Sequence, residues 1–172
     1  MFDPQSTPIS QRGSFLLAQL GAHASRLWAD RIAPLGLEPR HFALLGEVVE
    51  NEGQTQQQLA ERLGVHRNLM VGLIDDLQSR GFVERRPRRD DRRANSIVAT
   101  ADARELMAAA EVESVELERE LLGTLSRESY TELLGTLTAL VEGANLLPGV
   151  HPAMSNAPAT RDNDLMSGDG GN

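Results

Sequence analysis

The clearest hydrophobic pattern in the chain lies between residues 66 and 81. Met70, Leu73, Ile74 and Leu77 recur at spacings of three and four residues, which places them on one face of a helix. Most other positions of the segment are polar, so the pattern predicts a helix that buries one side and exposes the other. The segment ends on a glycine, a residue that commonly terminates helices.

A shorter helix is predicted directly before it, over residues 55–64. Thr55 can accept a hydrogen bond at the helix start, and Gln58 can return one to the backbone of Thr55. Gly64 ends the segment, because glycine enters the left-handed conformation without steric cost. Two short helices joined by a tight glycine turn form a helix-turn-helix.

A short hairpin follows the second helix. Residues 82–86 and 95–100 are strand candidates, and Pro87 with the polar run 88–93 forms the loop between them. Residues 80–93 contain seven arginines and three acids. In isolation such a run indicates a solvated charged loop. Attached to a helix-turn-helix it indicates a wing, whose arginines lie where DNA phosphates and the minor groove would be.

Further amphipathic segments flank this unit. We expect helices over residues 14–32, from residue 39 to a turn at 51–53, over 101–122 and over 126–146. The predicted fold class is mainly α with a small β-hairpin wing. The predicted organisation is a flexible N-terminus at 1–13, one winged helix-turn-helix domain at 14–147, and a disordered tail at 148–172 that is poor in apolar residues.

The flanking helices carry more apolar surface than one small domain can cover. We expect the excess to be buried against a second copy of the chain, through the helices at 14–32 and 101–146. A compact monomer capped by these helices is the alternative. The expected interface residues are Leu17, Leu20, Tyr130, Leu133, Leu137, Leu140 and Val141.

Charge is distributed unevenly along the chain, whose formal net charge is −8. Residues 62–102 carry nine arginines and six acids, whereas residues 103–172 carry four arginines and twelve acids. This division fits a protein that presents one surface to DNA and another elsewhere. The chain has no cysteine, which excludes disulfides and thiol-based oxidation sensors. It has no long apolar run and no signal peptide, so we expect a cytoplasmic protein that does not contact a membrane.

The run LGVHRNLMVGLIDDLQSRGFVERRPRRDDRRANSIVAT resembles the winged helix-turn-helix of MarR-family transcriptional regulators. The Asp-Arg-Arg at residues 91–93 matches the Asp-x-Arg element of the family's wing, and residues 39–45 resemble its second helix. The resemblance extends over residues 14–146. It departs from the family at residues 95–96, where Asn-Ser stands in a strand that is more often apolar.

The resemblance implies a homodimer in which the terminal helices of two chains interdigitate and hold two winged heads apart. It also implies that Arg93 is the wing-tip arginine and that Asp91 braces the wing. In proteins of this family, effectors enter a crevice between the first, second and fifth helices. Trp28, Arg40 and His41 could line it as an aromatic wall, a cation and a switchable polar group, although each is more often an ordinary packing or helix-end residue.

The exposed face of the predicted recognition helix carries residues that can read base edges. Asn68 can pair with adenine, Arg67 can pair with guanine or hold a phosphate, and Val71 can touch a thymine methyl group. Asp75 and Asp76 would repel phosphate, so we expect them to pair with arginines of the protein. The candidate DNA-binding residues are His66, Arg67, Asn68, Val71, Gly72, Arg86, Arg88, Arg89, Arg92 and Arg93.

The sequence therefore predicts a transcriptional regulator that binds double-stranded DNA sequence-specifically. We expect a repressor rather than an activator, bound as a homodimer to a pseudo-palindromic operator and released by a small aromatic or anionic ligand. The alternative is a winged-helix adaptor that has lost DNA binding, which the acidic helix at 111–120 favours. The chain shows no nucleophile–base pair, no phosphate-binding glycine loop and no histidines at metal-ligand spacing, so we expect no enzyme, metal or cofactor.

Overall fold

A computed structural model describes residues 7–88, 94–146, 150 and 154 of the 172-residue chain. The predicted fold class is confirmed, because the described residues form α-helices and one antiparallel hairpin. The elements are α1 (Gly13–Ile32), α2 (Pro39–Glu50), α3 (Gln56–Arg62), α4 (Arg67–Ser79), β1 (Val83–Pro87), β2 (Asn95–Ala99), α5 (Ala101–Leu122) and α6 (Arg127–Gly143). Two short 3₁₀ turns lie at Ile9–Gln11 and Ala33–Leu35.

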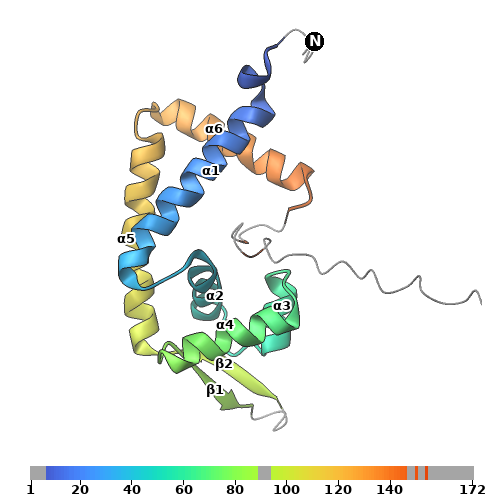
Figure 1. Ribbon diagram of the computed structural model, residues 1–172, viewed down its shortest axis with the longest axis vertical. Coiled ribbons are helices and arrows are strands. Elements are labelled where there is room, and N and C mark those ends of the chain that lie inside the picture. The colour runs from blue at the N-terminus through green and yellow to red at the C-terminus, as the bar shows by residue number, and fades with distance from the viewer. Residues whose placement is uncertain (1–6, 89–93, 147–149, 151–153, 155–172) are drawn as a thin grey trace, which may run out of the picture.

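The elements form a head and a helical stalk (Figure 1). The head contains α2, α3, α4 and the hairpin, with the hairpin at one end of the molecule. Helix α5 runs from the hairpin away from the head, α1 packs against it, and α6 turns back at the far end. No helix in the described part of the chain is long and apolar enough to cross a membrane.

The hydrophobic core lies in the head and where α1, α2 and α5 meet. All four residues of the apolar pattern on α4 are buried in it, which confirms the predicted buried face of that helix. The largest fully buried side chains include Ile32, Leu44, Leu45, Leu59, Ile97 and Val83, which come from most elements of the head and from the end of α1.

Local capping signals place the helix ends as predicted. The Thr55 hydroxyl accepts from the Gln58 backbone N–H, while the Gln58 side chain accepts from the Thr55 backbone, which completes the capping box of α3. The hydroxyls of Thr100 and Ser126 cap α5 and α6 by accepting from the backbone N–H groups of Ala103 and Ser129. Gly64 has a φ of 64°, as expected for a residue that ends a helix in the left-handed conformation.

The hairpin differs from the prediction at its edges. Pro87, expected in the loop, is the last residue of β1 and stands opposite Asn95. A proline fits there because the hairpin edge needs no N–H from it. Ser96 is accommodated by its hydroxyl, which donates to the Arg86 carbonyl at 3.1 Å. Ser96 also forms a bridge with Thr55, so the segment before α3 extends the sheet by one short pairing that the sequence pattern did not reveal.

Two positions of the expected C-terminal tail are described. Met154 is 1% exposed within the hydrophobic core, and Val150 packs against the same core. The expected tail at 148–172 thus contains two apolar side chains that lie against the core. The other residues of that stretch, and residues 1–6, lie outside the described part of the chain. Helix α6 ends at Gly143, three residues before the predicted end.

The stalk leaves a large apolar surface uncovered in the single chain. Helix α6 buries none of its residues, and α1 buries only Trp28 and Ile32, both at its head-proximal end. The exposed large hydrophobic residues of the three stalk helices are Phe15, Leu16, Leu17, Leu20, Val112, Val115, Leu134 and Leu140.

Candidate nucleic-acid interface

The outer face of α4 is polar and open to solvent. His66 precedes the helix, and Arg67, Asn68 and Gly72 on its first two turns are exposed, with Val71 half-buried beside them. A Cβ added at Gly72 would meet no atom within 4 Å, so packing within the chain does not require glycine there. The helix thus presents a polar stretch, which includes the cation of Arg67, on the side opposite its buried residues.

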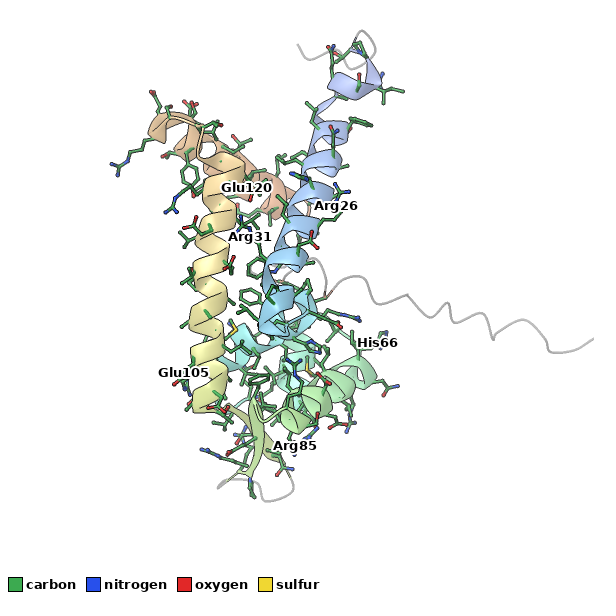
Figure 2. All side chains as sticks on the ribbon, turned by 60° about the vertical axis from the view of Figure 1, so that its left-hand side comes forward. Arg26, Arg31, His66, Arg85, Glu105 and Glu120 are labelled. Carbon is green, nitrogen blue, oxygen red and sulfur yellow. The ribbon has the colours of Figure 1, made fainter. Side chains whose placement is uncertain are left out.

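Asp75 is held by the hairpin. Arg85 of β1 donates through one guanidinium nitrogen to Asp75 and through another to Gln78, both on α4. The Arg85 side chain is 23% exposed and that of Asp75 is 58% exposed, so the pair lies at the rim of the packed surface. Figure 2 shows Arg85 on the hairpin beside α4. This pairing confirms that Asp75 is neutralised by an arginine of the protein.

Asp76 is held from two directions. Arg80, which directly follows α4, lies 3.4 Å from the Asp76 carboxylate, as the sequence predicts for an arginine partner. His41 of α2 is the second partner, with Nε2 3.2 Å from Asp76 Oδ2, and the sequence pattern did not indicate it. Arg80 also donates to the Gly36 carbonyl at 2.6 Å, in the turn before α2. These contacts fix α4 against the start of α2.

His41 is buried, with 9% of its surface exposed. Burial lowers the pKa of His41 below its usual value, and the nearby Asp76 and Glu38 carboxylates oppose this while Arg80 and Arg40 reinforce it. Its Nδ1 atom is buried without a hydrogen-bond partner in the described part of the chain. The neutral side chain with its proton on Nε2 therefore suits the site, because it donates to Asp76 and leaves Nδ1 as an unprotonated acceptor.

The hairpin carries further candidate arginines. Arg86 is exposed and pairs with Glu84 at 2.8 Å. Arg88 is half-buried, and its backbone N–H donates to the Ala94 carbonyl at 3.1 Å, which closes the described part of the hairpin. The other predicted wing residues, Arg89, Asp91, Arg92 and Arg93, lie outside the described residues.

A cavity of about 370 Å³ lies between α1, α2 and α5, where the family resemblance places an effector crevice. Trp28 and Phe42 form its aromatic wall, with ring centroids 4.7 Å apart and planes at 74°. The Trp28 Nε1 atom is buried without a hydrogen-bond partner among the described residues. Arg40 and His41 do not line the cavity: Arg40 lies 3.9 Å from Glu38, and His41 faces Asp76. The lining residues are Gly21, Ala24, Ser25, Trp28, Phe42, Ser114 and Leu117.

One ion-pair cluster that sequence reasoning missed fixes the stalk beside this cavity. Arg31 of α1 lies 3.1 Å from Glu113 and 2.5 Å from Glu120, both on α5. Figure 2 shows Arg31 and Glu120 facing each other across the two helices. No sequence motif links these residues, because the two helices are separated by the whole head. The cluster orders part of the acidic face of α5.

Comparison with known proteins relates the chain to one family of regulators. The sequence model of the MarR family matches residues 35–94, from the turn before α2 through the hairpin. CouR from Rhodococcus jostii RHA1, solved with p-coumaroyl-CoA, is 27% identical, with a TM-score of 0.66 over 78% of this chain and 95% of CouR. These matches support a MarR-family winged-helix regulator. They support a regulator that binds DNA, and the proteins that the chain resembles are transcriptional regulators rather than enzymes.

Two further structures support this assignment. The transcriptional repressor CouR, solved with a 23-mer DNA duplex, is 26% identical, with a TM-score of 0.69 over 77% of this chain and 94% of CouR. A probable transcriptional regulator from Pseudomonas aeruginosa is 26% identical, with a TM-score of 0.66 over 77% of this chain and 99% of that protein. The likeness to MarR-family structures thus extends well beyond the winged head.

Proposed function

We propose that this MarR-family regulator is a homodimeric repressor that binds a pseudo-palindromic operator and is released by a small aromatic or anionic ligand. The observation that carries the proposal is the polar outer face of α4, which stands next to the hairpin at the free end of the head. A helix enters the major groove with such a face, while a wing follows the adjacent backbone or minor groove.

The reading residues lie on the first two turns of α4. Asn68 pairs with adenine, Arg67 contacts guanine or phosphate, and Gly72 lets the helix approach the groove because no side chain projects there. His66 and Val71 flank this face. The pairing of Asp75 and Asp76 with basic side chains supports the proposal, because it offsets the repulsion between these carboxylates and DNA.

The wing contributes phosphate and minor-groove contacts. Arg86 and Arg88 are its described candidates, and the proposal extends to Arg89, Arg92 and Arg93, braced by Asp91, in the part that is not described. Each phosphate contact releases about one counterion, so binding should weaken steeply with salt.

The dimer is formed by the stalk. Exposed apolar patches of this kind are rare on monomers, and α6 buries none of its residues within its own chain. A hollow of about 620 Å³ in the elbow between α5 and α6, lined by Val115, Leu122 and Tyr130 among others, can receive an apolar helix of the partner chain. Residues Leu17, Leu20, Leu133, Leu137, Leu140 and Val141 complete the proposed contact.

The ligand binds in the cavity between α1, α2 and α5. Its volume of about 370 Å³ suits a small aromatic group. Trp28 Nε1, a buried donor without a partner in the described part of the chain, calls for an acceptor such as a carbonyl or carboxylate oxygen. CouR, whose structures contain DNA in one case and an aromatic acyl-CoA in another, supports a regulator that responds to such a compound.

The test is selection of a binding duplex from a random-sequence library, followed by titration with aromatic acids and their CoA thioesters. We expect one two-fold-symmetric sequence to be enriched, and at least one compound to release it. Trp28→Phe should keep duplex binding but require a higher concentration of that compound. Failure to enrich any sequence would favour the protein-adaptor alternative, to which the acidic face of α5 points.

A further inference from the structure

Asp76 is the point at which the recognition helix is tied to another helix of the head. Its two partners differ in what they can fix. Arg80 directly follows the last residue of α4, so its contact with Asp76 at 3.4 Å does not position α4 relative to α2. His41 belongs to α2, and its Nε2 lies 3.2 Å from Asp76 Oδ2. The His41 contact therefore joins the two helices directly through side chains.

The two protonation states of His41 differ at Nδ1, because Nε2 can donate to Asp76 in both of them. The neutral ring donates through Nε2 and carries no hydrogen on Nδ1, an atom buried without a partner among the described residues. A proton added to Nδ1 would create a buried N–H with no acceptor, which is costly. The charged groups that face the ring are Asp76 and Arg80 from α4 and Glu38 and Arg40 from the start of α2. The two negative and two positive charges offset one another, so burial decides that the neutral form of His41 is favoured.

Helix α2 also connects His41 to the proposed ligand cavity. Phe42, the next residue, packs edge-on against Trp28 in the cavity wall. Phe42 and His41 are neighbours in one helix, so a shift of α2 as a unit would move both side chains. At the start of α2, Phe42 thus lines the cavity and the adjacent His41 contacts α4.

We propose that His41 is a positioning residue for DNA recognition: in its neutral form it holds α4, through Asp76, at the angle that presents Asn68 to the DNA, and protonation releases this hold. The proposal rests on the proposed function, DNA binding by the outer face of α4. It assigns His41 a role on the recognition helix and outside the ligand cavity.

The decisive comparison is between the wild type and His41→Gln, on the duplex that the wild type selects from a random library. A glutamine amide can place a donor near the position of Nε2 but does not titrate. We expect similar affinities at pH 7.5 and, at pH 5.5 and equal ionic strength, an affinity of the wild type at least about threefold lower than that of His41→Gln. His23, His66 and all carboxylates are common to both proteins, so their titration cancels in the ratio. A ratio that does not change with pH would overturn the proposal.

A double-mutant cycle tests the partner. We expect the effects of His41→Ala and Asp76→Asn on duplex affinity to be non-additive by about twofold or more. The matched control is Asp75→Asn, which removes the charge of the neighbouring carboxylate held by Arg85. Its effect on duplex affinity should be independent of the effect of His41→Ala. If the two effects are independent in both cycles, the His41–Asp76 link is refuted.

If His41→Ala does not fold, the pH comparison with His41→Gln decides alone. If the wild type selects no duplex, the proposed function itself fails, whereas a constant ratio refutes only the role of His41.

Discussion

At the scale of single residues, Asn68 tests what the outer face of α4 does. It is exposed and lies opposite the buried stripe. Asn68→Ala should relax the preference at one base position in each half-site by about 1–3 kcal/mol. Arg86→Ala, on the hairpin, should weaken all sequences equally and flatten the slope of log K against log salt by about one. Affinities for the selected duplex and its single-base variants, at several salt concentrations, measure both. If Asn68→Ala weakens binding to every sequence equally, Asn68 contacts the DNA backbone and does not read a base.

His41 also makes a prediction about stability. Its pKa is lowered from 6.5 by burial, so between the folded-state pKa and 6.5 the unfolded chain binds more protons than the folded one. The stability that neutral His41 contributes is therefore fully present above pH 6.5 and is lost as the pH falls through the folded-state pKa. The Tm of the wild type relative to His41→Gln should be highest at pH 8 and should fall toward pH 5, as thermal unfolding monitored by circular dichroism can show. A Tm difference that is constant, or that increases on acidification, would contradict this.

At the scale of elements, the hairpin and α4 act as one unit because Arg85 joins them. Arg85→Ala should change the Tm little, since exposed ion pairs contribute about 0–1 kcal/mol. It should weaken duplex binding about fivefold or more, because it frees the hairpin and leaves the Asp75 carboxylate unpaired near DNA. Adding Asp75→Asn should recover part of the loss. Arg104→Ala, which breaks a comparable pair with Glu52 away from α4, serves as the control. No recovery in the double variant would exclude repulsion by Asp75.

Elements with local signals could be predicted from the sequence, and contacts between distant elements could not. The ends of α3, α5 and α6 follow from Thr55, Thr100 and Ser126, because capping bonds join residues three apart. The arginine partners of Asp75 and Asp76 were expected from charge alone. The contact of His41 with Asp76 was not, because it joins helices whose relative orientation no periodicity specifies.

At the scale of the whole molecule, the uncovered stalk predicts that the chain does not function alone. Leu140 is 51% exposed in the single chain, so an aspartate there costs the monomer little but would be buried unpaired in a dimer. Leu137→Asp with Leu140→Asp should yield a folded monomer that binds the selected duplex no better than random DNA. Ala139→Asp, on the opposite face of α6, should remain a dimer. Sedimentation equilibrium distinguishes these outcomes, and a double variant that stays dimeric would place the interface elsewhere.

The central claim is that two recognition helices, related by a two-fold axis, enter successive major grooves on one side of the duplex. Half-site centres should then lie about one turn apart, roughly 10 base pairs or 34 Å. The most direct test is to insert five base pairs between the half-sites of the selected duplex, which moves one half-site to the opposite face, and ten base pairs as a control for length. We predict that the five-base-pair insertion reduces affinity to that of a single half-site. Undiminished binding to that duplex would contradict the account.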